Sequence, residues 1–95
     1  IEKQALINTG AIIEHDNKIG AFAHLASDVA TAGNVTVGEC TMLGVGTKVI
    51  QGIIIGSNVV VGAGAVVIHN IPDHVTAVGI PAKIIKSLID NGAER

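Results

Sequence analysis

Aromatic residues and cysteine are almost missing from this 95-residue chain. Phe22 is the only aromatic residue, and Cys40 is the only cysteine. An intrachain disulfide is therefore impossible, and the cysteine usage gives no sign of an exported compartment. We expect a cytoplasmic protein whose core is built from aliphatic side chains.

Basic clusters and long hydrophobic runs are also lacking. The formal net charge is −2 and no group of Lys or Arg stands together, so the electrostatic footprint of a nucleic-acid-binding protein is absent. The longest run of apolar residues and glycine covers residues 59–68, whereas a membrane-spanning helix needs roughly 18 residues. We expect neither a nucleic-acid partner nor a membrane span.

What the chain does have is an excess of β-branched and small residues. Ile and Val together number 27, beside 12 Ala and 12 Gly, which favours a β protein rich in tight turns. The chain begins with Ile1 and shows no signal-peptide pattern, which we interpret as an excised domain.

An aliphatic residue recurs every six positions from the start of the chain. Eleven of the twelve residues at this spacing are Ile, Leu or Val, whereas random placement would give about four. The positions are Ile1, Ile7, Ile13, Ile19, Leu25, Thr31, Val37, Leu43, Val49, Ile55, Val61 and Val67. The pattern runs without insertion until Asp73, where the next apolar residue is due.

The other positions of the six-residue unit are equally regular. The residue two before each aliphatic is mostly small or β-branched, and both are predicted to point inward because residues two apart in a strand share a face. Nine of the twelve residues three after the aliphatic are Gly, Asn or Asp, which tolerate positive φ, so each unit is predicted to end in a corner. These corner positions are Gln4, Gly10, Asp16, Phe22, Asp28, Asn34, Cys40, Gly46, Gly52, Asn58, Gly64 and Asn70.

A short strand and a corner every six residues form the hexapeptide repeat of a parallel β-helix. With three sides to each turn, one coil takes 18 residues and the twelve units make about four coils. The sequence therefore predicts an all-β domain over residues 1–72 and a separate tail over residues 73–95. In the tail, a short C-terminal α-helix is expected because Pro81 suits a first helical turn and Gly92 a helix end. Its apolar stripe would consist of Ile84, Ile85, Leu88 and Ile89.

Several polar groups fall near one another in this chain. Glu14 directly precedes His15, and His24 follows nine residues later. Together with residues 8–38 and the tail sequence Gly79-Ile80-Pro81-Ala82-Lys83, they resemble the sialic acid O-acetyltransferase family of sugar O- and N-acetyltransferases. That family includes bacterial enzymes that acetylate nucleotide-linked amino sugars such as the bacillosamine precursor, and the resemblance covers nearly all of the chain.

The resemblance implies a left-handed β-helix and a role for each matching residue. His15 would be the catalytic base, Glu14 would orient or polarise it, His24 would line the acetyl-CoA site and Asn8 would lie near the sugar. The chemistry is consistent, because an imidazole accepts a proton readily near neutral pH when an amine or hydroxyl attacks a thioester. The same resemblance implies a homotrimer, with coenzyme A bound along the coils between neighbouring subunits.

The stacking of the coils suggests one further element of the site. Residues 18 apart stack, so Gly33 lies one coil, roughly 4.8 Å, above His15. Its backbone N–H, unobstructed by a side chain, is our candidate donor to the oxyanion of the tetrahedral intermediate. The resemblance implies that Gly79, Ile80, Pro81 and Lys83 lie at the adenine end of coenzyme A. Lys83 and Lys86 either offset phosphate charge there or form the solvated side of the tail helix.

Three alternatives stay open at this point. A zinc hydratase like the γ-class carbonic anhydrases uses the same prism, and His69 and His74 are five residues apart, but a third ligand would have to come from a neighbouring chain. We therefore expect no metal. An ice-binding solenoid would need an ordered threonine ladder, which the scattered threonines do not form. A coenzyme-A-binding remnant is the third, because related enzymes carry an N-terminal sugar-binding domain that this chain lacks.

Overall fold

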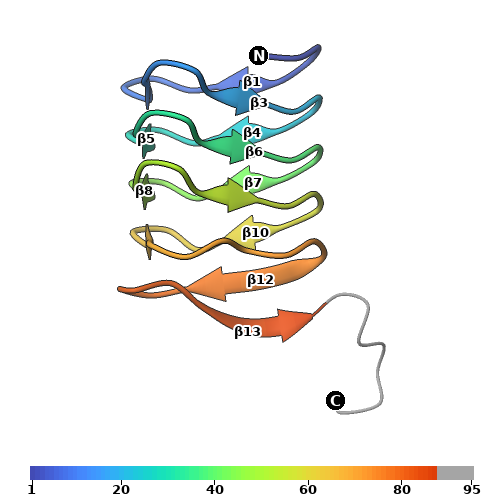
Figure 1. Ribbon diagram of the computed structural model, residues 1–95, viewed down its shortest axis with the longest axis vertical. Coiled ribbons are helices and arrows are strands. Elements are labelled where there is room, and N and C mark those ends of the chain that lie inside the picture. Colours follow the sequence, from blue (N-terminus) through green and yellow to red (C-terminus); the bar gives the residue numbers. More distant parts are fainter. Residues whose placement is uncertain (88–95) are drawn as a thin grey trace.

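The chain winds into a three-sided prism of short strands. The computed structural model describes residues 1–87, and within them thirteen strands form three stacks, parallel throughout except for the last strand, β13 (Figure 1). Face A holds β1 (Leu6–Ile7), β4 (His24–Leu25), β7 (Met42–Leu43), β10 (Val60–Val61), β12 (Val75–Val78) and β13 (Lys83–Ser87). Face B holds β2 (Ile12–Ile13), β5 (Ala30–Thr31), β8 (Lys48–Val49) and β11 (Val66–Val67). Face C holds β3 (Lys18–Ile19), β6 (Thr36–Val37) and β9 (Ile54–Ile55).

The stacking register is the one that the six-residue spacing predicts. Leu6 pairs with His24, Ile12 with Ala30 and Lys18 with Thr36, each 18 residues further on. The chain passes from face A to B to C in every coil, through three corners. We call these the A–B, B–C and C–A corners, and in the first full coil they comprise residues 8–10, 14–16 and 20–22. The predicted parallel β-helix is confirmed.

The core is the column of inward-pointing aliphatic residues. All nine residues of the six-residue series from Ile19 to Val67 are 3% exposed or less. The smaller residues two positions earlier join them in one cluster, which ends towards the N-terminus on half-buried residues such as Ile7 and Ile13. The narrow interior therefore has a place for small and β-branched side chains and no place for aromatic rings.

The corners adopt the backbone conformation that their residues favour. Eleven of the twelve predicted corner residues have positive φ, and the exception is Asn70. Asn70 instead uses its side chain, whose Oδ1 accepts a hydrogen bond of 2.8 Å from the N–H of Ile54. This exception marks the point where the regular coil changes.

The fourth coil is two residues shorter than the others. Val67 still pairs 18 residues back with Val49, but Ile71 bridges to Ile55, only 16 residues away, and Ala77 pairs with Val61 at the same offset. Ile71 thus takes the buried place that an apolar residue at position 73 would have filled. Past residue 72 the chain accordingly continues along the coil path to Val78, the end of β12.

The predicted C-terminal helix is wrong over residues 83–87. These residues form β13, which pairs antiparallel with β12 and so covers the last strand edge of face A. The side chains of Ile84 and Ile85 are both exposed there, so the apolar residues do not make a buried helical stripe. The rest of the predicted helix, with Leu88, Ile89 and Gly92, lies outside the described residues. Residues 1–87 contain no helix that is long and apolar enough to cross a membrane.

Glycines let successive coils approach closely at the C–A corner. Gly20, Gly38 and Gly56 stand in one column, and a Cβ atom added to Gly38 would lie 2.5 Å from the carbonyl carbon of Gly56 and from the N atom of Ser57. Backbone atoms cannot move aside as a flexible side chain can. These glycines are therefore required by the 18-residue stacking itself.

We expect Gly38→Ala to destabilise the protein by about 2 kcal/mol, because the added methyl group overpacks the coil contact. For a domain of this size the melting temperature should fall by roughly 10 °C. Gly46→Asn is the matched control, since Gly46 has φ +75° with open space around it and Asn occupies equivalent corners. Thermal unfolding followed by circular dichroism measures both, and equal melting temperatures for the two variants would contradict the steric account.

Candidate functional site

His15 stands at the B–C corner of the first coil, between β2 and β3. Its side chain is 71% exposed, and its ring lies against Gly33 of the next coil. A Cβ atom added to Gly33 would lie 2.6 Å from Cε1 and 2.7 Å from Nε2 of the ring. The absence of a side chain at Gly33 therefore makes room for the imidazole.

The carboxylate beside this imidazole belongs to Asp16. Its Oδ2 is 3.2 Å from Nδ1 of His15, and the positive φ of Asp16, 58°, turns the side chain back towards the ring. Glu14, which the sequence indicated for this role, makes no hydrogen bond to His15 within residues 1–87 and lies on the face B side of the corner. The signal that would have found Asp16 is its place in the corner position, where positive φ turns the chain from face B to face C.

Two groups beside the ring are available to a ligand. Nε2 of His15 has no hydrogen-bond partner in the part of the chain that the structure describes. The N–H of Gly33 donates to no backbone carbonyl of residues 1–87. Glu39 and Ser57 occupy the same position in their repeats as Gly33. The N–H of each donates to a side chain of the following coil. We therefore expect the Gly33 N–H to point towards the later coils, away from the first coil, which carries His15.

A shallow cavity of about 450 Å³ adjoins this corner and extends across face B. Its floor is largely apolar, and Glu14, Lys48 and Gln51 supply its polar side chains. The lining residues are Ile12, Glu14, Ala30, Thr31, Ala32, Lys48, Val49, Ile50 and Gln51. Lys48 is held partly in place because its Nζ donates to the carbonyl oxygen of Asp28 at 2.6 Å.

Asn8 and His24 come together at a different corner. Nδ2 of Asn8 and Nε2 of His24 are 3.1 Å apart, and both residues are half-buried. They lie at the A–B corner and on face A, so face B separates them from His15. The sequence assigned Asn8 and His24 to sugar and cofactor, and one copy of the chain brings these two together with each other but not with His15.

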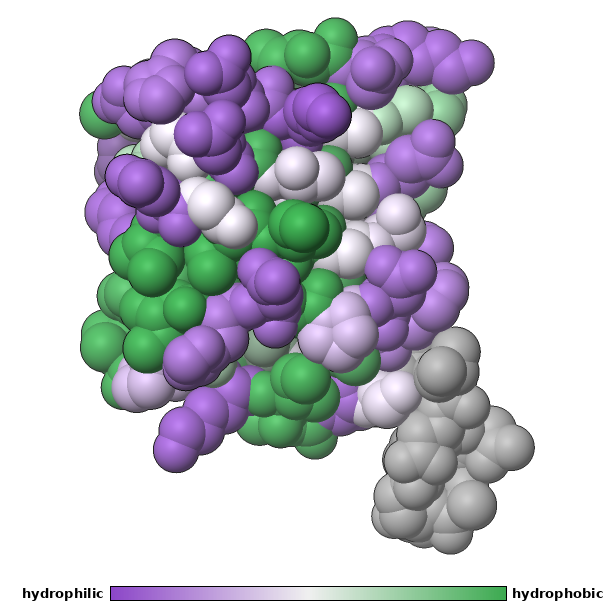
Figure 2. All heavy atoms as spheres, in the orientation of Figure 1, coloured by the Kyte–Doolittle hydropathy of each residue, from purple (hydrophilic) through white to green (hydrophobic). Residues whose placement is uncertain are grey.

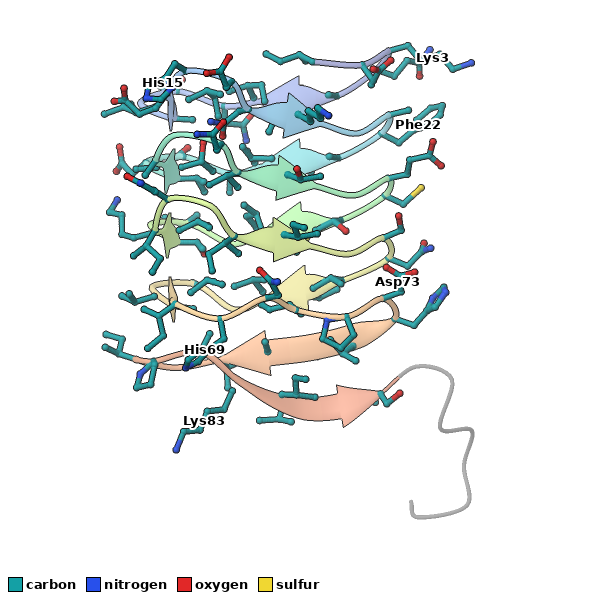
Figure 3. The ribbon with its side chains drawn as sticks, viewed as in Figure 1. Lys3, His15, Phe22, His69, Asp73 and Lys83 are labelled. Carbon is teal, nitrogen blue, oxygen red and sulfur yellow. The ribbon has the colours of Figure 1, made fainter. Side chains whose placement is uncertain are left out.

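The segment from Gly79 to Lys83 lies at the far end of face B. The carbonyl oxygen of Gly79 accepts a hydrogen bond from the N–H of Val66, and the N–H of Ala82 donates to the carbonyl oxygen of Val66. This segment therefore forms the rung after β11, four rungs and about 19 Å along the prism from His15. Ile80, Pro81 and Lys83 are exposed there. Figure 3 shows His15, His69 and Lys83 along one side of the prism, and Lys3, Phe22 and Asp73 along the other.

The two histidines that suggested a zinc site do not lie together. His69 is at the B–C corner, whereas His74 is at the C–A corner with φ 61°. Face C separates them, so their spacing of five residues places them on different edges. No group of three or more His, Cys, Asp or Glu side chains able to hold a metal ion occurs within the described residues.

Comparison with known proteins identifies the family and the handedness of the β-helix. A mutant of perosamine N-acetyltransferase from Caulobacter crescentus, solved with CoA and GDP-perosamine, superimposes with a TM-score of 0.86 and 51% sequence identity over 87% of this chain and 40% of that chain. The chain belongs to the hexapeptide-repeat acetyltransferases. Its β-helix is left-handed, as the resemblance implied.

Other members of this superfamily are similar over the same region. The acetyltransferase domain of PglB from Neisseria gonorrhoeae, solved with acetyl coenzyme A, has a TM-score of 0.84 and 38% identity over 85% of this chain and 40% of that chain. Serine acetyltransferase from Buchnera aphidicola (subspecies Schizaphis graminum) is 38% identical over 87% of this chain and 33% of its own length. The Escherichia coli K12 enzyme is 33% identical over 90% of this chain and 37% of its own. No family model matches the chain.

This chain thus spans between one third and two fifths of the length of these relatives.

We expect Gly33→Ala to displace the imidazole of His15 while leaving the fold nearly as stable as before. The added methyl group meets an exposed side chain that can swing away, so the loss should stay below about 1 kcal/mol. In NMR spectra the ring resonances of His15 should shift and those of His69 and His74 should not. A stability loss as large as that of Gly38→Ala would show that the crowding involves backbone and would contradict this account.

Proposed function

We propose that this chain is the catalytic β-helix of an acetyl-CoA-dependent N-acetyltransferase that acylates an amino group of a nucleotide-linked sugar. One observation carries the proposal: the His15 imidazole is held between Gly33 and Asp16 with Nε2 unpaired. Glu14 and Ala32, which directly precede His15 and Gly33, line the cavity on face B. The solved relative with 51% identity is a perosamine N-acetyltransferase bound to CoA and GDP-perosamine, which supports the same chemistry here.

In the proposed reaction His15 is the general base. As the amine nitrogen of the sugar attacks the thioester carbonyl, Nε2 accepts the proton that the nitrogen must lose, and the C–S bond then breaks to release the CoA thiolate. The Asp16 carboxylate, at Nδ1, fixes the tautomer with the proton on Nδ1 and stabilises the imidazolium that forms. Asp16 takes over the orienting role that the sequence indicated for Glu14.

Gly33 provides the donor for the oxyanion in this proposal. Its N–H is not used by the backbone ladder, and donors aimed at a developing negative charge are the largest single contribution in many acyl transfers. Because this N–H is expected to face the later coils, the thioester carbonyl would lie on that side of His15. That position is also the His15 end of the cavity.

The donor groove in this proposal runs from His15 along face B. The apolar cavity floor suits the alkyl parts of a long, thin ligand, and the exposed segment Gly79, Ile80, Pro81 and Lys83 lies where such a ligand would end. Lys83 carries positive charge there, which favours phosphate groups. Lys86 lies further along β13, opposite Thr76 on face A. The acetyltransferase domain of PglB, solved with acetyl coenzyme A, supports this choice of donor.

A homotrimer would complete the site, because one copy does not bring His15 to Asn8 and His24. If face B of one copy packs against the A–B corner of the next, His15 meets Asn8 and His24 of the neighbouring copy. Exposed apolar side chains on both surfaces support such packing: Leu6, Met42 and Val60 on face A, and Ile12, Ile50 and Ile68 along face B. Figure 2 shows apolar side chains gathered on the left of the view, the side formed by face B.

We place the enzyme in the cytoplasm, as its cysteine usage suggests.

His15→Ala should lower the rate of acetyl transfer roughly 10²- to 10⁴-fold, the usual contribution of a general base. CoA thiol release is measured with acetyl-CoA and either GDP-perosamine or L-serine as acceptor. His74→Asn is the control, because it changes a histidine at a different corner, where the backbone has a positive φ that Asn tolerates.

We expect transfer to GDP-perosamine and not to serine. A wild-type rate in His15→Ala would overturn the assignment, and transfer to serine alone would replace the proposed acceptor by that of the serine acetyltransferases. Binding of acetyl-CoA without any transfer would indicate a coenzyme-A-binding remnant.

The shared site predicts complementation between two inactive variants. His15→Ala and His24→Ala should each be inactive alone, but co-expression should restore about a quarter of the wild-type activity, since one interface in four joins an intact His15 to an intact His24. Size-exclusion chromatography with light scattering reports the trimer in the same samples. Mixed trimers that remain inactive would show that His15 and His24 do not share one site across an interface.

A further inference from the structure

Asn17 is a polar residue in a column that is otherwise almost entirely apolar. It occupies the inward position two before Ile19, where the neighbouring coils of the same face have Val35 and Ile53. Its Nδ2 nevertheless lies within hydrogen-bond distance of three backbone carbonyl oxygens: that of Ala32 at 2.8 Å, and those of Glu14 and His15 at 3.1 Å each. Because an amide group has two N–H donors, one of them is shared between two of these oxygens. From its inward position, Asn17 is thus hydrogen-bonded to the backbone of the corner that carries His15.

Part of this arrangement is a general device of the fold. Thr41 and Thr47, in the same inward position of later units, donate from Oγ1 to the carbonyl oxygens of Gly56 and Gly62. In all three cases the acceptor lies 15 residues further along, where the next coil enters a corner. A threonine therefore suffices for the bond between coils, and the two bonds from Asn17 to Glu14 and His15 are additional.

The additional bonds come with an unpaired atom. Oδ1 of Asn17 is buried and has no hydrogen-bond partner among the described residues. A buried polar atom without a partner is unfavourable, and an aliphatic residue such as Val35 would avoid it. Positions at which a sequence departs from the best packing choice are frequently functional.

The carbonyl oxygen of His15 links the hydrogen bonds of Asn17 to the candidate site. It accepts both the Nδ2 bond of Asn17 and a 3.0 Å bond from the N–H of Asn34 in the next coil. Asn34 follows Gly33, the residue on which the imidazole rests. The backbone of His15 is thereby fixed to the coil that carries its contact surface.

We infer that Asn17 is a positioning residue that holds the Glu14–His15 corner so that the imidazole stays over Gly33. The kinetic part of this inference rests on the proposed role of His15 as general base. Asn17 touches neither substrate nor cofactor and acts only through the backbone of His15. The structural part can be tested without any assay of activity.

Hydrogen exchange of the Asn34 amide tests the structural part. Asn17→Val keeps the apolar packing of the column and removes all three bonds, so exchange of the Asn34 amide should accelerate at least about tenfold, because local opening becomes easier. Thr41→Val is the matched control: it removes the equivalent bond at the C–A corner and should leave Asn34 unchanged. Unchanged exchange of Asn34 in Asn17→Val overturns the inference, whatever the enzyme's activity.

Steady-state kinetics with acetyl-CoA and GDP-perosamine test the catalytic part. Asn17→Val should lower kcat about tenfold with little change in the KM for acetyl-CoA, because misplacing a reacting group affects the transition state. Asn17→Thr, which retains only the bond to Ala32, should fold as the wild type does and lose nearly as much kcat. Wild-type kcat in Asn17→Thr would show that the bonds to Glu14 and His15 have no role.

A double-mutant cycle separates failure of this inference from failure of the proposed function. In a His15→Ala background, Asn17→Val should cause no further loss, since a residue that acts through His15 contributes nothing without it. An equal loss in both backgrounds overturns the inference while His15 remains the base. A fully active His15→Ala enzyme removes the proposed function instead, and the exchange of Asn34 then still decides whether Asn17 holds the corner.

Discussion

The constraint on which everything else in this protein depends is the stacking of aliphatic side chains inside a narrow prism. Each coil adds three inward-pointing branched residues directly above those of the coil before, and the interior has no room for anything larger. This explains why the chain consists so largely of Ile, Val, Ala and Gly and has a single aromatic residue. It also explains the glycine column at the C–A corner, since coils in this register bring backbone against backbone there.

Because the interior is committed to packing, chemistry is confined to corners and to the outer surfaces of the faces. Corner residues have positive φ and side chains in solvent, so a corner can present a polar group in a fixed orientation without disturbing the core. The B–C corner of the first coil does so with His15 and Asp16. Gly33, one coil further on, gives the imidazole a surface to rest on, so the site needs two coils although its reactive group comes from one.

The positions of individual groups were predictable to different degrees. The stacking of Gly33 above His15 followed from the 18-residue period alone, and the structure agrees. The partner of the imidazole did not follow, because a one-dimensional pattern does not say whether Glu14 or Asp16 turns back, and only the positive φ of Asp16 decides it. The helix predicted after Pro81 failed for a similar reason: the exposed edge of β12 offered backbone hydrogen bonds to residues 83–87, and pairing with that edge outweighs a weak local helical preference.

The amino-acid sequence by itself determined the solenoid, its coil length and its corners, because period and residue type act locally and repeat. Only the tertiary structure decided how the repeat closes, with Ile71 entering the core two residues early, and which side chains meet. Contacts such as Asp16 with His15, Asn8 with His24 and Asn17 with three carbonyl groups depend on the direction of each corner in space. That direction is set by packing between coils, which a linear pattern does not contain.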